Sequence, residues 1–251
     1  MFVACSTLCF GKLPFEEALR VIREMRFAKA DLAFHAEGPH WRPADILADV
    51  GRAAQKLRAA NLAYAAFHVA MDPGPDALPQ LRAISRLARV LAVPLITVPA
   101  SPAGSDLAAE VTRLKEWVTI AEHEGLILTV DTQADTLTAD PLGAMELCRQ
   151  VPGLGITLDP SCYQNGPHAP QNFDCLMPLV RHVRLRDTGK APDQFQVRVG
   201  QGEIEYGRII TQLEHEQYDR TLTVDIRDIP DGAFPIEPEV RKLKYLLESL
   251  V

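Results

Sequence analysis

The stretch between residues 155 and 187, GITLDPSCYQNGPHAPQNFDCLMPLVRHVRLRD, contains the pattern on which the fold prediction rests. It begins and ends with a short apolar run that leads to an aspartate, GITLD (155–159) and HVRLRD (182–187). The segment after the first run is rich in Pro, Gly and Asn, which is typical of the loop after a buried strand. The two runs start about 30 residues apart, the length of one strand-and-helix unit.

The same unit recurs along the whole chain. Amphipathic stretches such as LPQLRAISRLARVLA (78–92) separate six further apolar runs: FVACS (2–6), ADLAF (30–34), LAYAAFH (62–68), PLITVP (94–99), LILTVD (126–131) and TLTVDI (221–226). Eight such units predict a single (β/α)8 barrel domain over residues 1–251, with its site at the C-terminal ends of strands five to eight. A doubly wound open sheet is the alternative, but it usually has fewer repeats, and no G-x-G-x-x-G follows the first run.

Charge and composition exclude several classes of partner. The net charge of −7 argues against nucleic acid, because such binding starts from a basic surface. No apolar run reaches the roughly 18 residues of a membrane helix, and MFVACSTLCFG (1–11) lacks the basic region of a signal peptide, so it is expected to be a buried strand. Five cysteines without a CxxC pair predict reduced thiols and a cytoplasmic protein, with homo-oligomer formation left open.

The alternation of side chains along a strand places charged groups inside the predicted barrel. In TLTVDI the apolar Leu222 and Val224 must face the helices, so Asp225 points inward. The same reasoning for strands five, six and seven predicts these inward residues: Asp131, Asp159, His182, Arg184 and Arg186. Three carboxylates and an arginine therefore converge where barrel enzymes carry their catalytic groups.

A single aspartate at a strand end usually forms a turn or caps a helix. Three of them in adjacent inward positions repel one another in a low-dielectric pocket unless a cation or a proton intervenes. We therefore interpret the cluster as a functional or formerly functional site.

Other candidates have a structural reading beside the functional one. Cys162 is a potential nucleophile or a buried inert thiol, and His68 ends the third strand as a ligand-binding or a packed histidine. Lys190 can bind an anionic substrate or can be a solvated loop charge. Gly200 and Gly202 precede a helix expected near residue 203, where their N–H groups can bind a phosphate or form a tight turn.

Four motifs resemble those of a known family: GITLDPSCY (155–163), HVRLRD (182–187), VGQGEIEYGRII (199–210) and TLTVDI (221–226). Their order is similar to that of the xylose isomerase-like TIM barrels, the superfamily of sugar phosphate isomerases and epimerases that also contains the type 2 AP endonucleases. Those relatives show G-x-T-x-D-x-x-H, then H-x-H-x-K-D, a G-x-G turn and a final strand that ends in Glu. The resemblance covers nearly the whole chain.

The resemblance implies a divalent ion held by two Glu, one Asp and the second His of H-x-H, with the Glu pair moving a proton between adjacent substrate carbons. In this chain Asp159 is the one identical ligand. Asp131 and Asp225 stand in place of the glutamates, Arg184 in place of the histidine, and Cys162 in place of the histidine that follows the strand-six Asp.

Arg184 is the decisive departure, because a guanidinium has only donors and cannot ligate a metal. Each change from Glu to Asp also retracts a carboxylate by about 1.5 Å. We therefore expect Arg184 to replace the metal as counter-ion of Asp131, Asp159 and Asp225, with no cofactor. Mn²⁺ or Mg²⁺ held by these three carboxylates is the alternative, and a decayed site is another.

The sequence thus predicts an isomerase- or epimerase-like protein for a small hydroxylated carbonyl compound, such as a sugar, sugar acid or sugar phosphate. Asp131 and Asp225 are the expected acid–base pair, and Arg184 is expected to stabilise the enediolate oxygen. The residues expected to bind the substrate are His182, Cys162, Arg186, Lys190 and His68. A non-catalytic barrel that binds a carbohydrate or a protein is the alternative, and a nuclease fits worst, because its several histidine ligands are missing.

Overall fold

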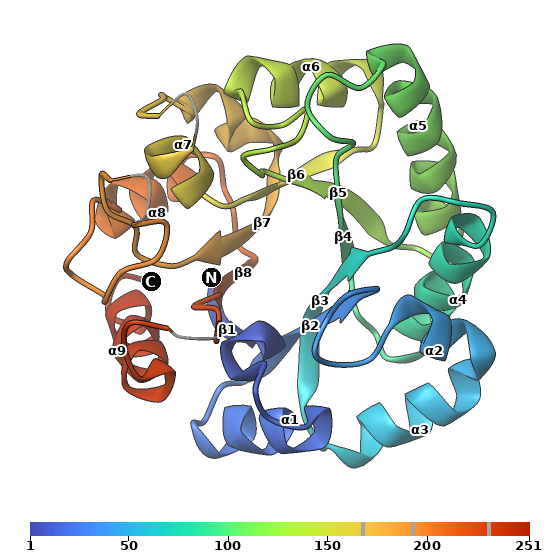
Figure 1. Ribbon diagram of the computed structural model, residues 1–251, viewed down its shortest axis with the longest axis horizontal. Coiled ribbons are helices and arrows are strands. Elements are labelled where there is room, and N and C mark those ends of the chain that lie inside the picture. Colours follow the sequence, from blue (N-terminus) through green and yellow to red (C-terminus); the bar gives the residue numbers. More distant parts are fainter. Residues whose placement is uncertain (167–168, 192–193, 230–231) are drawn as a thin grey trace.

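The computed structural model describes residues 1–166, 169–191, 194–229 and 232–251. Its centre is a closed barrel of parallel strands that pair in chain order, which confirms the predicted (β/α)8 fold (Figure 1). The strands are β1 (Phe2–Ser6), β2 (Lys29–His35), β3 (Ala63–Ala70), β4 (Leu95–Pro99), β5 (Ile127–Asp131), β6 (Gly155–Leu158), β7 (Val180–Leu185) and β8 (Thr221–Val224). The predicted first strand is therefore confirmed.

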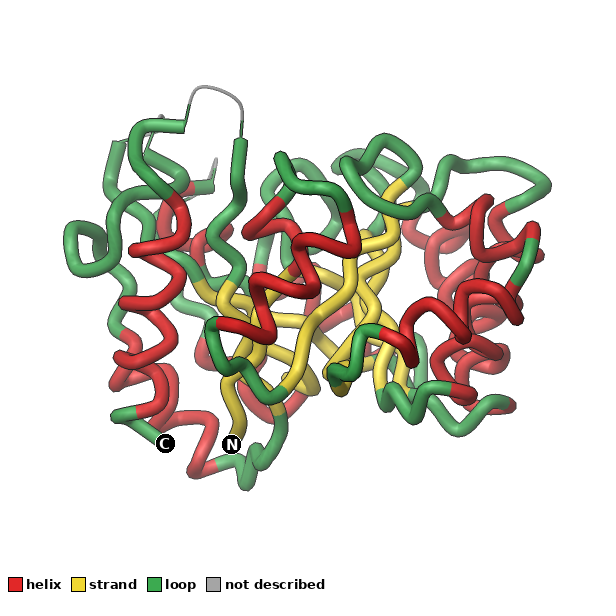
Figure 2. The backbone as a smooth tube through the Cα atoms, turned by 90° about the horizontal axis from the view of Figure 1, so that it is seen from below, coloured by secondary structure: helices red, strands yellow, loops and turns green. Residues whose placement is uncertain are grey.

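Helices surround the barrel, and the loops that follow the strands lie opposite the two chain ends (Figure 2). The α-helices are α1 (Phe15–Glu24), α2 (Pro43–Ala48), α3 (Val50–Ala59), α4 (Ala77–Val90), α5 (Leu107–His123), α6 (Pro141–Gln150), α7 (Ser161–Asn165), α8 (Tyr206–His215) and α9 (Ile236–Glu248). Short 3₁₀ turns are η1 (Thr7–Phe10) and η2 (Asp174–Leu179). None of the helices described is both long enough and apolar enough to span a membrane.

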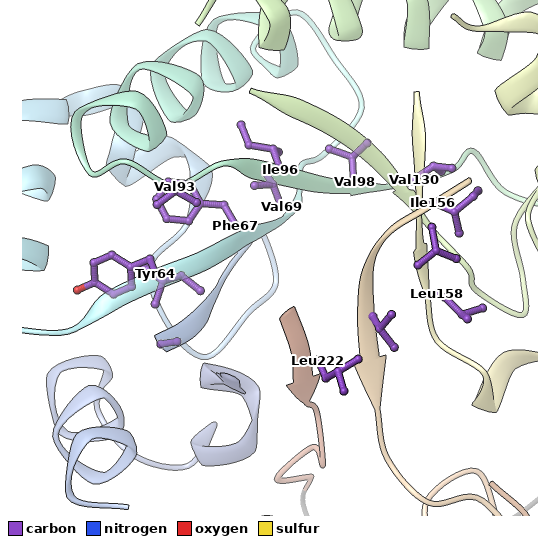
Figure 3. Packing of buried hydrophobic residues seen from close by; sticks show 14 of the residues in the cluster. Tyr64, Phe67, Val69, Val93, Ile96, Val98, Val130, Ile156, Leu158 and Leu222 are labelled. Atoms are coloured by element: carbon purple, nitrogen blue, oxygen red, sulfur yellow. The ribbon is translucent and has the colours of Figure 1, made fainter. Parts of the chain in front are cut away.

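The outward faces of the strands form the hydrophobic core with the helices, as the alternation requires. Phe67, Ile96, Val130, Ile156 and Leu222 are all buried in this layer (Figure 3). Because the apolar neighbours are held outward, the polar residues between them are forced into the barrel.

A layer of three threonines forms the floor beneath the charged residues. The hydroxyl of Thr97 lies 3.0 Å from that of Thr129 and 2.8 Å from that of Thr157, and the last two are 2.8 Å apart. Thr129 and Thr157 each stand two residues before an inward aspartate, Asp131 and Asp159. The barrel interior below the site is thus packed and hydrogen-bonded. This layer fixes the position of the two aspartates along the barrel axis.

Candidate active site

Arg184 lies at the centre of the barrel, with 1% of its surface exposed. Its Nη2 donates to Asp225 Oδ1 at 2.9 Å and to Ser6 Oγ at 3.3 Å. Its Nη1 donates to Nδ1 of His68 and lies 4.0 Å from Asp131 Oδ2. Strands β1, β3 and β5 and the residue that directly follows β8 therefore all supply partners for one guanidinium.

Arg186 follows the end of β7 and binds a different pair of carboxylates. Its Nη2 donates to Asp159 Oδ2 and, at 3.1 Å, to Asp225 Oδ2. The other oxygen of Asp159 accepts the N–H of Ser161 at 3.0 Å and the hydroxyl of the same residue. Asp225 thus bridges both arginines, whereas Asp159 forms its ion pair with Arg186.

This pairing corrects one expectation. Arg184 was expected to be the counter-ion of all three aspartates, but Asp159 forms its ion pair with Arg186. The Arg184 side chain extends across the barrel toward β1 and β3, so Asp159 pairs instead with Arg186, which follows the end of β7.

Two residues of the cluster, Asp31 and Ser6, were missed by the sequence reasoning. Asp31 in β2 is buried, and its Oδ2 lies 3.0 Å from His182 Nε2 and 3.9 Å from Arg184 Nε. Ser6 ends β1, and Arg227 follows β8 with its Nε 3.6 Å from Asp225 Oδ2. Asp31 could have been found, because a charge inside the apolar run ADLAF is itself a signal.

Four buried carboxylates in this cluster, those of Asp31, Asp131, Asp159 and Asp225, outnumber its two fully buried guanidiniums. Arg227 adds a third cation, but about a third of its side chain is exposed. One negative charge is therefore in excess, and such a charge in a low-dielectric site attracts a proton.

The two aspartates expected to form the acid–base pair differ in their ability to hold that proton. Burial raises the pKa of Asp131, whose nearest guanidinium nitrogen is 4.0 Å away. Burial acts in the same direction on Asp225, but Arg184, Arg227 and Arg186 outweigh it and hold the pKa of Asp225 well below its usual range. Of the two, Asp131 therefore has the raised pKa, whereas Asp225 is held ionised.

Two expected substrate-binding residues are buried beside the cluster. His182 is 2% exposed, and its Nε2 lies 3.2 Å from Thr223 Oγ1 as well as near Asp31, so it sits in the barrel interior below the arginines. Cys162 is also 2% exposed, and burial raises the pKa of its thiol. A protonated buried thiol is a poor nucleophile, which favours the inert reading.

Lys190 lies apart from the cluster. Its side chain is 80% exposed, and its Nζ lies 3.4 Å from Glu203 Oε2. Together with Gln164 and Asn165 it lines a groove of about 720 Å³ at the C-terminal end of the barrel. The loop thus carries Lys190 to the surface, apart from the other residues expected to bind the substrate, which favours its reading as a solvated loop charge.

The N–H groups of the two glycines proposed to bind a phosphate already donate to a protein carboxylate. The N–H groups of Gly200 and Gly202 donate to Asp187 Oδ2 at 2.7 and 3.1 Å, and Asp187 is buried. The helix that follows begins at Tyr206 and not near Glu203. Asp187 thus takes the place expected for an anionic ligand and makes the tight-turn reading correct.

The arrangement of the three aspartates does not fit a divalent ion. The Arg184 Nη2 atom lies 2.9 Å from Asp225, so a positive charge already stands where an ion would need that carboxylate. Asp159 is engaged by Arg186 and Ser161. Over the parts of the chain that the structure describes, no three His, Cys, Asp or Glu side chains are placed to share a metal.

The pairing of Asp159 with Arg186 leads to a measurable expectation. Asp159→Asn should lower the free energy of unfolding by about 1.5–3 kcal/mol, because Arg186 loses one charged hydrogen bond and keeps the one to Asp225. Urea denaturation measures this change. A variant as stable as the wild type would show that the pair contributes nothing.

Comparison with known proteins gives a family and a set of folds. A model of the family "Xylose isomerase-like TIM barrel" matches residues 19–248, whereas no curated protein matches the sequence. The probable 3-DHS dehydratase of petrobactin synthesis from Bacillus anthracis is 15% identical with a TM-score of 0.73, and 99% of each chain is covered. D-allulose 3-epimerase from Methylomonas sp. is 12% identical with a TM-score of 0.73, covering 100% of this chain and 98% of that one.

A third solved structure is a xylose isomerase-like TIM barrel protein from Mycobacterium smegmatis, in complex with magnesium. It is 16% identical with a TM-score of 0.75, and covers 100% of this chain and 98% of its own. At these identities the likeness shows the shared fold, and the residues of the site have to be judged from this chain.

Proposed function

The chain belongs to the xylose isomerase-like TIM barrel family, and we propose that it is an isomerase- or epimerase-like enzyme that works without the divalent ion implied by the family resemblance. Its substrate in this proposal is a small hydroxylated carbonyl compound that carries an acidic group, and its reaction is proton abstraction next to the carbonyl. Structural neighbours named as an epimerase and a dehydratase make this chemistry a reasonable starting point.

The observation that carries the proposal is the contrast between two neighbouring aspartates. Asp225 is held ionised between Arg184 and Arg186, while the pKa of Asp131 is raised by burial. Two carboxylates whose environments separate their pKa values are the usual signature of an acid–base site. In this assignment Asp131 abstracts and returns the proton, and Asp225 keeps the arginines in place.

The free hydrogen-bond donors indicate which arginine meets the substrate. Arg184 uses Nη1 and Nη2 on protein groups, so only its Nε has no partner among the described residues. Arg186 has two such donors, Nε and Nη1. We therefore assign the developing enediolate oxygen or the acidic group of the substrate to Arg186, and Arg184 becomes its support from below.

Phe195 lies over the assigned donor. Its ring centroid is 4.7 Å from the Arg186 guanidinium carbon, and 37% of its surface is exposed. A planar guanidinium with an aromatic ring on one face still has donors available in its plane. A carboxylate or phosphate fits these in-plane donors, whereas a neutral hydroxyl gains no charge–charge attraction from them.

Sugar acids or sugar phosphates should therefore stabilise the fold more than neutral sugars. At 100 times Kd the gain should be about 2.7 kcal/mol, visible as a rise in Tm. Arg186→Met should abolish that rise. Lys190→Met is the matched control, because it removes a cation from the exposed groove and should leave most of the rise. A rise with neutral sugars alone would contradict the assignment of Arg186.

Solvent deuterium exchange tests the reaction directly. Incubation of candidate sugar acids with the protein in D2O and a chelator should replace the hydrogen next to the carbonyl, as followed by proton NMR. Asp131→Asn should lose this exchange, because the amide cannot accept the proton. If stabilising ligands are found and none of them exchanges, the chain is the non-catalytic carbohydrate-binding barrel.

A further inference from the structure

We infer that His68 is a positioning residue, which reserves one oxygen of Asp131 for the substrate by donating a hydrogen bond to the other. This inference rests on the proposed function for the role of Asp131, while the arrangement of the three groups stands on the geometry alone.

The Nδ1 atom of His68 must be an acceptor. Arg184 Nη1 lies within hydrogen-bond distance of it, and a guanidinium has donors and no acceptor. A neutral imidazole whose Nδ1 accepts carries its proton on Nε2. The arginine therefore imposes one tautomer on His68.

His35 supports the same tautomer from the mouth side. Its Nε2 lies 3.1 Å from the same Nδ1 atom, and the two rings meet edge to face with centroids 4.7 Å apart. Since Nδ1 of His68 carries no proton in this tautomer, any hydrogen bond between the two rings is donated by His35 Nε2 and shares the single Nδ1 lone pair with Arg184. Burial and the neighbouring His68 lower the pKa of His35 to about 2, so the His35 imidazole is neutral at pH 7.

The proton on Nε2 of His68 points to Asp131. The distance from Nε2 to Asp131 Oδ2 is 3.2 Å, and both side chains are more than nine-tenths buried. Asp131 Oδ1 is buried and has no partner among the residues that the structure describes. The two oxygens are thus unequal, because Oδ2 is held by His68 and Oδ1 is left to accept a proton from a substrate carbon.

An imidazolium at His68 would remove this asymmetry, and its surroundings oppose it. Burial and Arg184 lower the pKa of His68 well below its usual value, and outweigh the opposite influence of Asp31 and Asp225. With both ring nitrogens engaged by protein groups, His68 has no polar atom free for a substrate. Its role is therefore to act through Asp131, and not to bind the ligand as the sequence suggested.

Imidazole NMR on the ¹⁵N-labelled protein at pH 7 tests the tautomer without any substrate. Among the signals of the seven histidines, that of His68 is identified as the one missing from the spectrum of His68→Gln. We expect His68 as the neutral Nε2–H form. Asp131→Asn should move its Nε2 proton upfield, because a neutral oxygen replaces the carboxylate. Asp159→Asn is the matched control and should leave the signal in place, because Asp159 bonds to Arg186 and Ser161.

An Nδ1–H form, an imidazolium, or a proton that does not respond to Asp131→Asn would overturn the inference. The link to catalysis is tested by comparing His68→Gln with His68→Asn, because the Gln side chain places an N–H near the Nε2 position and the Asn side chain does not. Deuterium exchange should be at least about tenfold slower in His68→Asn than in His68→Gln. Equal rates would contradict positioning. The expected NMR signals without exchange in any variant would instead refute the proposed reaction and leave the hydrogen-bond assignment intact.

Discussion

Replacing Arg184 with methionine should lower the free energy of unfolding by about 3–5 kcal/mol. The substitution keeps much of the side-chain volume but removes the cation from a fully buried ion pair of the site, in which Arg184 and Asp225 are 1% and 0% exposed. Asp225 retains Arg186, while Asp131 and Asp31 lose their nearest guanidinium. Urea unfolding, analysed at an unchanged m-value, measures the difference.

Lys190→Met is the control for the charge change itself. The Lys190 side chain is 80% exposed, so its loss should alter stability by no more than about 0.5 kcal/mol. Asp225→Leu combined with Arg184→Met should be more stable than the sum of the single changes predicts, because no unpaired buried charge remains between them. Equal effects of Arg184→Met and Lys190→Met would show that the central ion pair does not stabilise the fold.

The effect of Arg184→Met should also depend on pH in a known direction. The pKa of Asp225 is lowered in the folded protein, mainly by Arg184 acting against burial. A carboxyl group with a lowered folded pKa stabilises the fold above its unfolded pKa of about 3.9, and this contribution is lost as the pH falls toward the folded value. The stability difference between wild type and variant should therefore change little between pH 7 and about 5, and shrink as the pH falls from about 5 toward 3.

The faces of the strands could be predicted because packing determines them. Leu222, Val224, Val183 and Leu185 are all fully buried on the helix side, so the charged residues between them had to point into the barrel. A slip by one residue would have turned these four apolar side chains into the barrel and placed the charges among the helices. The convergence of carboxylates and arginines follows from this constraint alone.

The partners within the barrel could not be predicted in the same way. Alternation along a strand says nothing about contacts across the barrel, where Arg184 meets Ser6 and His68 from β1 and β3. The β6–β7 register places Thr157 beside His182, which by counting would put Asp159 beside Arg184. The pairing expected from the register is not the one observed, because a long arginine side chain can place its donors near acceptors on more distant strands.

The misfit of the site to a divalent ion leads to the last prediction. Arg184→His alone should bind Mn²⁺ poorly, because Asp131 and Asp225 remain about one C–C bond, roughly 1.5 Å, shorter than glutamates. Ligand distances must fall within about 0.2 Å of their ideal values for a good site. The triple variant Asp131→Glu, Arg184→His and Asp225→Glu should therefore bind Mn²⁺ at least about tenfold more tightly than the single variant, as measured by calorimetry.

Arg186 sets a limit on what the triple variant can reach. Its Nη2 binds Asp159 and lies 3.1 Å from Asp225 Oδ2, so it competes for two of the four ligand positions of the triple variant. Arg186→Lys keeps the charge but replaces the planar fork by a single flexible donor, so adding it to the triple variant should increase the affinity again. The same three changes with Arg184→Met in place of Arg184→His provide the control without an imidazole. If that control or the single variant matches the triple variant, ligand geometry does not explain the loss of the family's metal ligands.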